Sequence, residues 1–238
     1  MNPQLKTIIL KEVKEVSGRK DYLFNMFVNV VLCSAVGVIY ALASTGPAQV
    51  LLTELNLIIF PPFVMFLVSF PFIQEKFSDE KLVLRFEALL TTPNSFKTIW
   101  AGKIASIILL SYPIMIIAMG VLLVTSNVLT GLNPLSILST PVWITMIFVG
   151  PSIPILYACF SSWSILRFTH PELMNVIKYF ALGGAILVFI TSGHVAKSIA
   201  SGQLVNWPIL TYSTLGLISL FCIIFFLIER LDKEKITV

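Results

Sequence analysis

The chain has 238 residues, of which 57% are hydrophobic and only 12% are charged, and its mean hydropathy is +0.93. A soluble domain carries about 25% charged residues, so this chain has too few charges to cover a globular surface. The composition excludes a soluble enzyme and a disordered regulator. It indicates an integral membrane protein with a net charge of +4.

Residues 1–20 are predicted to form an amphipathic helix. Apolar residues recur in it at helical spacing, namely Leu5, Ile9, Val13 and Val16. We expect them to lie opposite much of the charge, which is carried by Lys11, Glu12, Glu15 and Arg19. Such a helix lies in the inner membrane interface, with its basic residues near the anionic head groups of membrane lipids. A simple extension of the first span is the alternative.

Six apolar stretches follow and predict six membrane helices, since about 20 apolar residues cross the bilayer core. They lie near residues 22–45, 50–73, 99–126, 141–166, 174–196 and 207–229. A spanning barrel is excluded because barrel strands alternate apolar and polar residues, whereas these runs are continuously apolar. The sequence therefore predicts an all-α integral membrane protein with a single six-span domain over residues 1–238.

The basic residues predict the orientation in the membrane. The N-terminal segment, the loops after the second and fourth spans, and the tail together hold 15 of the 16 Lys and Arg residues. Only Lys197 lies in a loop on the other side. By the positive-inside rule, both termini are cytoplasmic and the protein is a multi-pass protein of the cell membrane. This topology explains the basic charge without any nucleic-acid partner.

The longest cytoplasmic loop, residues 74–98, combines charged residues with an apolar stripe. The apolar residues at near-helical spacing are Leu82, Val83, Phe86, Leu89 and Leu90. Pro93 ends the stretch because it disfavours helix at Thr92. The charged residues, including Lys81, are expected to be exposed. A short helix of this kind can pack against its own bundle or bind in a groove of a cytoplasmic partner, and the pattern leaves both open.

The sequence contains no catalytic or metal-binding motif of its own. Residues 101–104 look like part of a phosphate loop, but position 97 is Lys where the first Gly belongs, and Ile104 replaces the required Ser or Thr. The three cysteines lie in apolar runs and are expected to be small buried hydrophobes. Glu54 is expected to be an interfacial charge near the outer end of the second span. A proton-driven pump, which would need ionisable groups inside the spans, is therefore weakly supported, and the energy for any pumping should come from elsewhere.

The stretch FEALLTTPNS at residues 86–95, followed by IWAGK at 99–103, resembles the permease subunits of type-2 ATP-binding-cassette exporters. Those permeases commonly carry a glutamate–charge pair after the second span, which Glu75-Lys76 matches. A Leu-Glu-x-Leu-Leu-x-Thr-Pro run follows in the family, and then a Gly-Lys that opens the third span. The layout of an amphipathic helix, six spans and a charged tail is similar too. The chain departs from the pattern at Leu84-Arg85, where the family has Gly-Thr, and at Phe86, where it has Leu.

The resemblance implies a permease that pairs with a second copy or a sister permease. Two separate ATPase subunits would bind its cytoplasmic face and hold ATP and magnesium, so no cofactor is expected in this chain. The resemblance further implies that the loop after the second span is the coupling segment, a helix that contacts the ATPase. Its matching residues are Glu75, Lys76, Leu82, Arg85, Phe86, Glu87, Leu89, Leu90, Thr92 and Pro93.

The uncharged spans favour an apolar or amphipathic substrate for export. Two other classes of function are also compatible with the sequence. One is an ATP-independent channel or transporter, which would need polar or charged rings along a pore. The other is a membrane immunity or scaffold protein that binds a partner without moving cargo.

Overall fold

The computed structural model describes residues 3–42, 46–82, 95–131, 138–167 and 207–230, together with 133, 136 and 205. Within these ranges every regular element is a helix and no strand occurs, as the sequence predicts. Five helices are long and apolar enough to cross a membrane. They correspond to the predicted spans at 22–45, 50–73, 99–126, 141–166 and 207–229. The span predicted at 174–196 lies outside the described residues.

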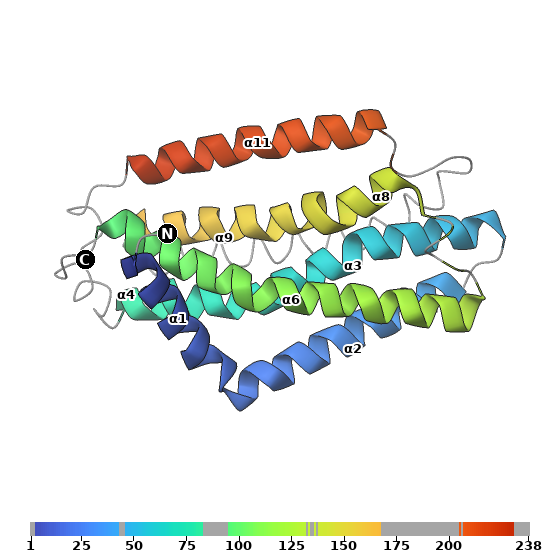
Figure 1. Cartoon of the computed structure of the whole chain (residues 1–238), viewed down its shortest axis with the longest axis horizontal. Coiled ribbons are helices and arrows are strands. Elements are labelled where there is room, and N and C mark those ends of the chain that lie inside the picture. The colour runs from blue at the N-terminus through green and yellow to red at the C-terminus, as the bar shows by residue number, and fades with distance from the viewer. Residues whose placement is uncertain are drawn as a thin grey trace.

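The N-terminal segment is helical, as predicted, and it folds back on the bundle. Helix α1 (Pro3–Ser17) and helix α2 (Lys20–Leu42) meet at a sharp bend at Gly18–Arg19. Figure 1 shows the two helices as a V, with α1 lying across the bundle. Helix α1 packs against α6 (Phe96–Thr130), and its residue Val16 is part of the hydrophobic core.

A continuous helical rod forms the centre of the bundle. It comprises α3 (Pro47–Ile73), the π-helix η1 (Gln74–Asp79) and α4 (Glu80–Leu82). Gly46 precedes it with a φ of 67°, and Pro47, whose missing N–H would be unpaired there anyway, starts the helix. Helix α3 packs against α2, α6 and α9 (Gly150–Arg167). Pro71 lies just before η1, where the regular α-helical hydrogen bonding gives way to π geometry.

The rod corrects one expectation, since residues 74–82 were predicted to belong to a loop outside the bundle. They continue the helix instead, and Lys76, Phe77 and Ser78 are buried. The physical reason is that the charged residues of this stretch find partners on neighbouring helices, so the chain need not leave the bundle at Gln74.

Helix α6 is longer than the predicted span at 99–126 at both ends. The Ser95 hydroxyl caps its start by accepting a hydrogen bond from the Thr98 backbone N–H at 3.2 Å. Gly131, with a φ of 67°, ends it and donates its N–H to the Asn127 carbonyl. Its 35 residues measure about 52 Å at 1.5 Å per residue. That length exceeds the roughly 30 Å of the hydrocarbon core, so the helix can reach well past it.

The C-terminal half of the described chain runs along the other side of α3. Helix α8 (Thr140–Ile144), the π-helix η2 (Thr145–Val149) and α9 form one rod, and α11 (Trp207–Glu229) lies beside it (Figure 1). The Trp163 indole N–H donates to the Leu227 carbonyl at 3.2 Å. Only 6% of the apolar window of α11 is buried in this chain, so most of this helix presents hydrophobic side chains outward.

All described basic residues lie in α1, at the bend that follows it (Arg19), or at the helix ends near it. These ends are the first residue of α2, η1 and α4, the first two turns of α6, and the C-terminal ends of α9 and α11 (Figure 1). The opposite end, with Gly46 and Gly131, carries no described Lys or Arg. The fold therefore gathers at one end the charges that the positive-inside rule assigns to the cytoplasm.

This arrangement predicts the outcome of a cysteine-labelling experiment. In a variant without native cysteines, Asn133→Cys should react with a membrane-impermeant maleimide added to intact cells, because residue 133 is exposed at the uncharged end. Lys14→Cys, exposed on α1, should react only after the cells are permeabilised. The opposite pattern would overturn the orientation, and equal labelling of both sites in intact cells would overturn the two-ended arrangement.

Candidate functional site

Seven charged residues form a network, here called the ion cluster, where α1, the rod of η1 and α4, and α6 meet. Its members are Glu12, Glu15, Arg19, Glu75, Lys76, Glu80 and Lys103. Four carboxylates and three cations give it a formal charge of −1. Ionic groups buried in a membrane protein are costly unless they are paired, so a paired cluster at this place is the strongest candidate for a functional site.

Lys103 lies at the centre of the cluster and only 1% of its side chain is exposed. Its ammonium group donates to both carboxylate oxygens of Glu80 at 2.8 Å and to Glu12 Oε1 at 3.2 Å. Glu80 lies in α4, Glu12 in α1 and Lys103 in α6. One ammonium group therefore binds three separate elements together.

A second part of the cluster lies where α1 contacts η1. The Lys76 ammonium is 2.8 Å from Glu12 Oε2 and 3.2 Å from Glu15 Oε1, and its side chain is 4% exposed. Arg19, at the bend between α1 and α2, donates to Glu75 at 2.7 Å and to Glu15 at 2.8 Å. The pairs are thus continuous from the bend of the N-terminal V to the start of α6.

The electrostatics of the cluster favour the charged forms of Glu12 and Arg19. Burial alone would raise the pKa of Glu12, but Lys103 and Lys76 outweigh it and hold that pKa below the ordinary value of 4.5. The hydrogen bond to Glu75 raises the pKa of Arg19. At neutral pH, therefore, Glu12 is a carboxylate and Arg19 a cation. Removing one partner would leave an uncompensated buried charge.

Close packing brings α1 to the cluster. A Cβ atom at Gly102 would lie 2.7 Å from Ile8 Cγ2, so only glycine lets α1 approach α6 at this point. The next residue, Lys103, supplies the charge that pairs with Glu12. The Gly-Lys pair that carries part of the family resemblance therefore has a physical role here: the glycine provides the space for α1 and the lysine provides its partner.

Lys81 corrects another expectation, because it is 3% exposed and not on the surface. Its ammonium group donates to the carbonyl oxygens of Ile165 and Leu166, both at 3.0 Å. These carbonyls belong to the last turn of α9, which has no intrahelical donors for them. Burial lowers the pKa of Lys81 below its ordinary value of 10.5. The contact ties α4 to the end of α9.

The predicted coupling residues fall into two groups in the structure. Glu75 and Lys76 lie in η1 and face α1, and the burial of Lys76 means that its partners are within this chain. The side chain of Leu82 lies outside the described residues, as do Arg85, Phe86, Glu87, Leu89, Leu90, Thr92 and Pro93. The structure therefore shows the flanks of this segment and not its middle.

The apolar face predicted for α1 exists, but it packs within the protein. Val16 is buried, and Leu5, Ile9 and Val13 are partly buried on the side that contacts α6. Glu12 was expected on the opposite, charged face. It lies instead among the apolar residues, because it follows Leu5 by seven positions and Ile9 by three. That spacing was the signal that could have identified Glu12 as a buried carboxylate.

Glu54, the charge predicted near the outer end of the second span, is buried within the protein. It is 7% exposed and lies two turns inside α3, with buried Thr53 and Asn56 nearby in sequence. The Asn56 amide donates to the Gly37 carbonyl of α2 at 2.7 Å. This polar stretch lies at the end of α3 opposite the ion cluster.

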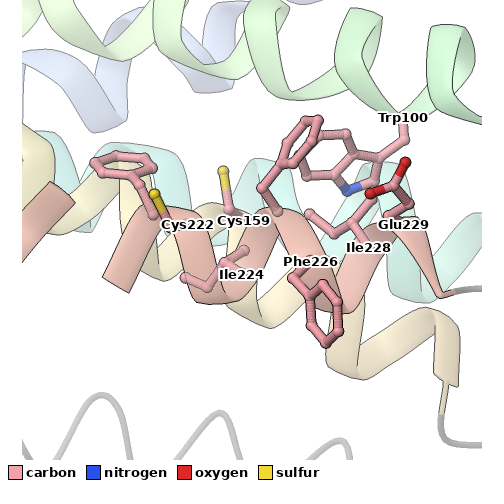
Figure 2. Close-up of a pocket in the computed structure, with 9 residues that line it drawn as sticks. Trp100, Cys159, Cys222, Ile224, Phe226, Ile228 and Glu229 are labelled. Carbon is pink, nitrogen blue, oxygen red and sulfur yellow. The ribbon is translucent and has the colours of Figure 1, made fainter. Parts of the chain in front are cut away.

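An apolar groove of about 530 Å³ runs between α6, α9 and α11 (Figure 2). Trp100 and Cys159 form part of it, and Cys222, Phe226 and Glu229 line it from α11. Cys33 and Cys159 are buried as expected, whereas Cys222 is exposed. No group of His, Cys, Asp and Glu in the described residues could hold a metal ion.

No family model matches this chain, and no curated protein or solved structure matches it either.

The ion cluster predicts a large difference between two lysine variants of α6. Lys103→Met leaves Glu80 and Glu12 without their central cation, and it should lower the free energy of unfolding by about 3–5 kcal/mol. Lys97→Met, in the same helix, removes a pair with Glu229 whose side chains are 61% and 58% exposed, so it should cost only about 0–1 kcal/mol. Titration of the purified protein from mild detergent into dodecyl sulfate measures both. Equal losses would contradict a structural role for the cluster.

Proposed function

We propose that this chain is the permease subunit of an ATP-binding-cassette exporter, which pairs with a second permease and binds two separate ATPase subunits. The segment between α4 and α6 is the coupling segment, and the cargo is apolar or amphipathic. The observation that carries the proposal is that both flanks of this segment are fixed to the bundle by buried charges. The resemblance of residues 86–103 to such permeases supports the same assignment.

Because both flanks are bonded to other helices, a movement of the segment would be transmitted to the bundle. Glu80, three residues before position 83, pairs at 2.8 Å with Lys103, which lies eight residues after Ser95. Lys81 adds the contact to the last turn of α9. A partner that moves residues 83–94 would therefore pull on α3, α6 and α9 together.

The start of α6 extends this linkage to the remaining helices. Trp100 donates its indole N–H to the Ser162 hydroxyl of α9 at 2.9 Å. Lys97 lies 3.4 Å from Glu229 at the end of α11, and Gly102 lies against α1. The first two turns of α6 thus contact α1, α4, α9 and α11, so a displacement there reaches most of the bundle.

In the proposed mechanism, ATP drives the two ATPases together and moves the two coupling segments with them. Rigidly linked helices then change their packing as bodies, between a state open to the inside and a state open to the outside. ATP contributes only to the extent that it binds one of these states better than the other. The ion cluster serves to keep α1, α4 and α6 in one body during this change.

The surfaces of α9 and α11 support an apolar or amphipathic cargo. Besides the groove of Figure 2, a second groove of about 280 Å³ lies between Leu156 and Phe160 of α9 and Leu220 and Leu227 of α11. Apart from Glu229, at one end of the larger groove, no charged residue lines either one. A strongly charged cargo would lack partners in them.

A sixth membrane crossing is part of the proposal and is supported by the direction of α9 and α11. Trp163 bonds to Leu227, 64 positions later, and Leu156 and Leu220, also 64 positions apart, line the same smaller groove. The two helices are therefore parallel, and each ends near the basic end of the bundle. A chain that leaves α9 at Arg167 must return to the opposite end before α11 begins at Trp207.

The sixth crossing predicts opposite labelling at its two ends. Lys197→Cys should react with an impermeant maleimide in intact cells, whereas Arg167→Cys, at the basic end, should react only after permeabilisation. Both experiments use the variant without native cysteines. If Lys197→Cys is protected in intact cells but labelled after permeabilisation, the crossing is absent.

The coupling role predicts a strong effect of Phe86→Asp. The variant removes an aromatic anchor and adds a charge, and truncation of such an anchor costs about 2–4 kcal/mol of binding. This corresponds to a complex that is about 30- to 700-fold weaker. The measurement is co-purification of the ATPase, normalised to the permease recovered from the membrane, together with the Kd of the two purified components.

Two controls accompany this experiment. Phe86→Leu restores the residue that the family has at this place and should retain most of the binding, and the exposed Lys97→Ala should change it little. Lys81 is unsuitable as a control because it is buried. Unaltered ATPase recovery and unaltered transport in Phe86→Asp would overturn the coupling role, whereas loss of the permease itself would indicate that Phe86 packs on its own bundle.

A further inference from the structure

The rod of α8, η2 and α9 has an irregular point at its middle. In η2 the backbone has π geometry, and the Gly150 N–H donates to the Thr145 carbonyl, five residues back. Pro151 follows directly and has no N–H. The carbonyl of Ile147, four residues before Pro151, therefore lacks the donor that a regular α-helix would give it. Long helices kink at such prolines and π turns.

A side chain of another helix supplies the missing donor. The Tyr112 hydroxyl of α6 donates to the Ile147 carbonyl at 3.2 Å. Inside a membrane, a carbonyl that a proline has freed is costly unless a neighbouring group bonds to it. In this conformation, the Ile147 carbonyl therefore depends on α6 for its hydrogen bond.

The bond between Tyr112 and the rod lies far from the basic end of the bundle. Tyr112 is 16 residues after Phe96, where α6 begins, and Pro151 is 16 residues before Arg167, where α9 ends. At 1.5 Å per residue, both lie about 24 Å from the basic end. The irregular point thus separates α9, which leads to the charged end, from α8, which leads to the other end.

Helix α3 packs closely against the same part of the rod. A Cβ atom at Gly150 would lie 2.6 Å from Pro62 Cγ, so glycine is needed for this approach. Pro61 and Pro62 are consecutive prolines inside α3, and in α6 Pro113 follows Tyr112. Each proline removes a helical hydrogen bond. The rod, α3 and α6 are therefore all irregular beside these contacts, where bending is easiest.

We propose that residues 147–151 are a hinge in the rod and that Tyr112 is the positioning residue that holds it in the conformation seen here. On the basic side of the hinge, Trp100 of α6 bonds to Ser162 of α9, and Lys81 bonds to the last turn of α9. Loss of the Tyr112 bond would therefore let α8 move away from α6 while α9 stays in place. The inference concerns this chain alone and does not depend on the proposed exporter function.

The first test is a double-mutant cycle on the purified full-length chain. Tyr112→Phe removes the donor of the Ile147 carbonyl and should lower the melting temperature by about 2–4 °C, the shift typical of one lost hydrogen bond in a chain of this length. Pro151→Ala restores a backbone N–H for this carbonyl, so Tyr112→Phe should cost clearly less in that background. Equal losses in the two backgrounds would overturn the role of Tyr112.

Tyr22→Phe is the matched control for this cycle. The Tyr22 hydroxyl also donates to a backbone carbonyl of a neighbouring helix, that of Leu110 in α6 at 3.0 Å, but it lies away from the hinge. Its loss should cost the same with and without Pro151→Ala. A reduced cost for Tyr22→Phe as well would show a general effect of Pro151→Ala and would contradict the proposal.

The second test measures the bend with two pairs of spin labels in a variant without native cysteines. The outer pair joins Val128 of α6 to Thr140 of α8, beyond the hinge. The inner pair joins Leu109 of α6 to Phe160 of α9, on the basic side of it. All four side chains are exposed, so labels there should not disturb the packing.

The hinge predicts different responses of the two pairs. Tyr112→Phe should broaden the distribution of distances in the outer pair and leave that of the inner pair unchanged. Adding Pro151→Ala should narrow the outer distribution again, because the rod regains its own hydrogen bond. An outer distribution that does not change in Tyr112→Phe, or an equal broadening of both pairs, would overturn the hinge.

Discussion

The buried ammonium group of Lys103 is the interaction on which the arrangement of the basic end depends. It is enclosed by Glu80 of α4 and Glu12 of α1, and an ion in such a place is tolerated only while both carboxylates remain close. Because the three residues lie far apart in the sequence, the requirement to pair one charge fixes three elements relative to one another. Gly102 makes this possible by letting α1 come close enough for Glu12 to reach its partner.

The two ends of the bundle therefore differ in how they are held together. At the basic end, ion pairs and the contact of Lys81 with the α9 carbonyls add directional bonds to the apolar core. At the other end, the described contacts are apolar or are single hydrogen bonds such as that of Asn56 with Gly37. In lipid, apolar contacts between helices are easily exchanged for contacts with acyl chains, whereas a buried ion pair is not. A change in packing is therefore easier at the end without charges.

The sequence was sufficient to predict the five described helices that are long and apolar enough to cross a membrane, because a run of about 20 apolar residues has few alternatives. The bounds of α11 agree with the prediction at both ends, and those of α2, of α3 and of the rod formed by α8, η2 and α9 agree within about three residues. The site was predicted less well, since Lys81 was expected to be exposed and Glu12 was expected on the charged face of its helix. Charged residues near a membrane surface are usually solvated. A buried one is recognised only by its partners, which lie far away in the sequence and become visible only in the structure. Glu12 was the one case with a local signal, because it interrupts an apolar stripe.

The π-helix η1 has a consequence for the faces of the rod. A π turn contains one residue more than an α turn, so the residues after it are rotated by about 100° from the direction that a regular helix would give them. After this rotation Glu80 faces Lys103 and Lys81 faces the α9 carbonyls. Were η1 to tighten into regular α-helix, Glu80 and Lys81 would turn away from Lys103 and from the α9 carbonyls while α3 itself stayed in place. The π geometry of the six residues Gln74–Asp79 thus sets the direction in which Glu80 and Lys81 face relative to α3.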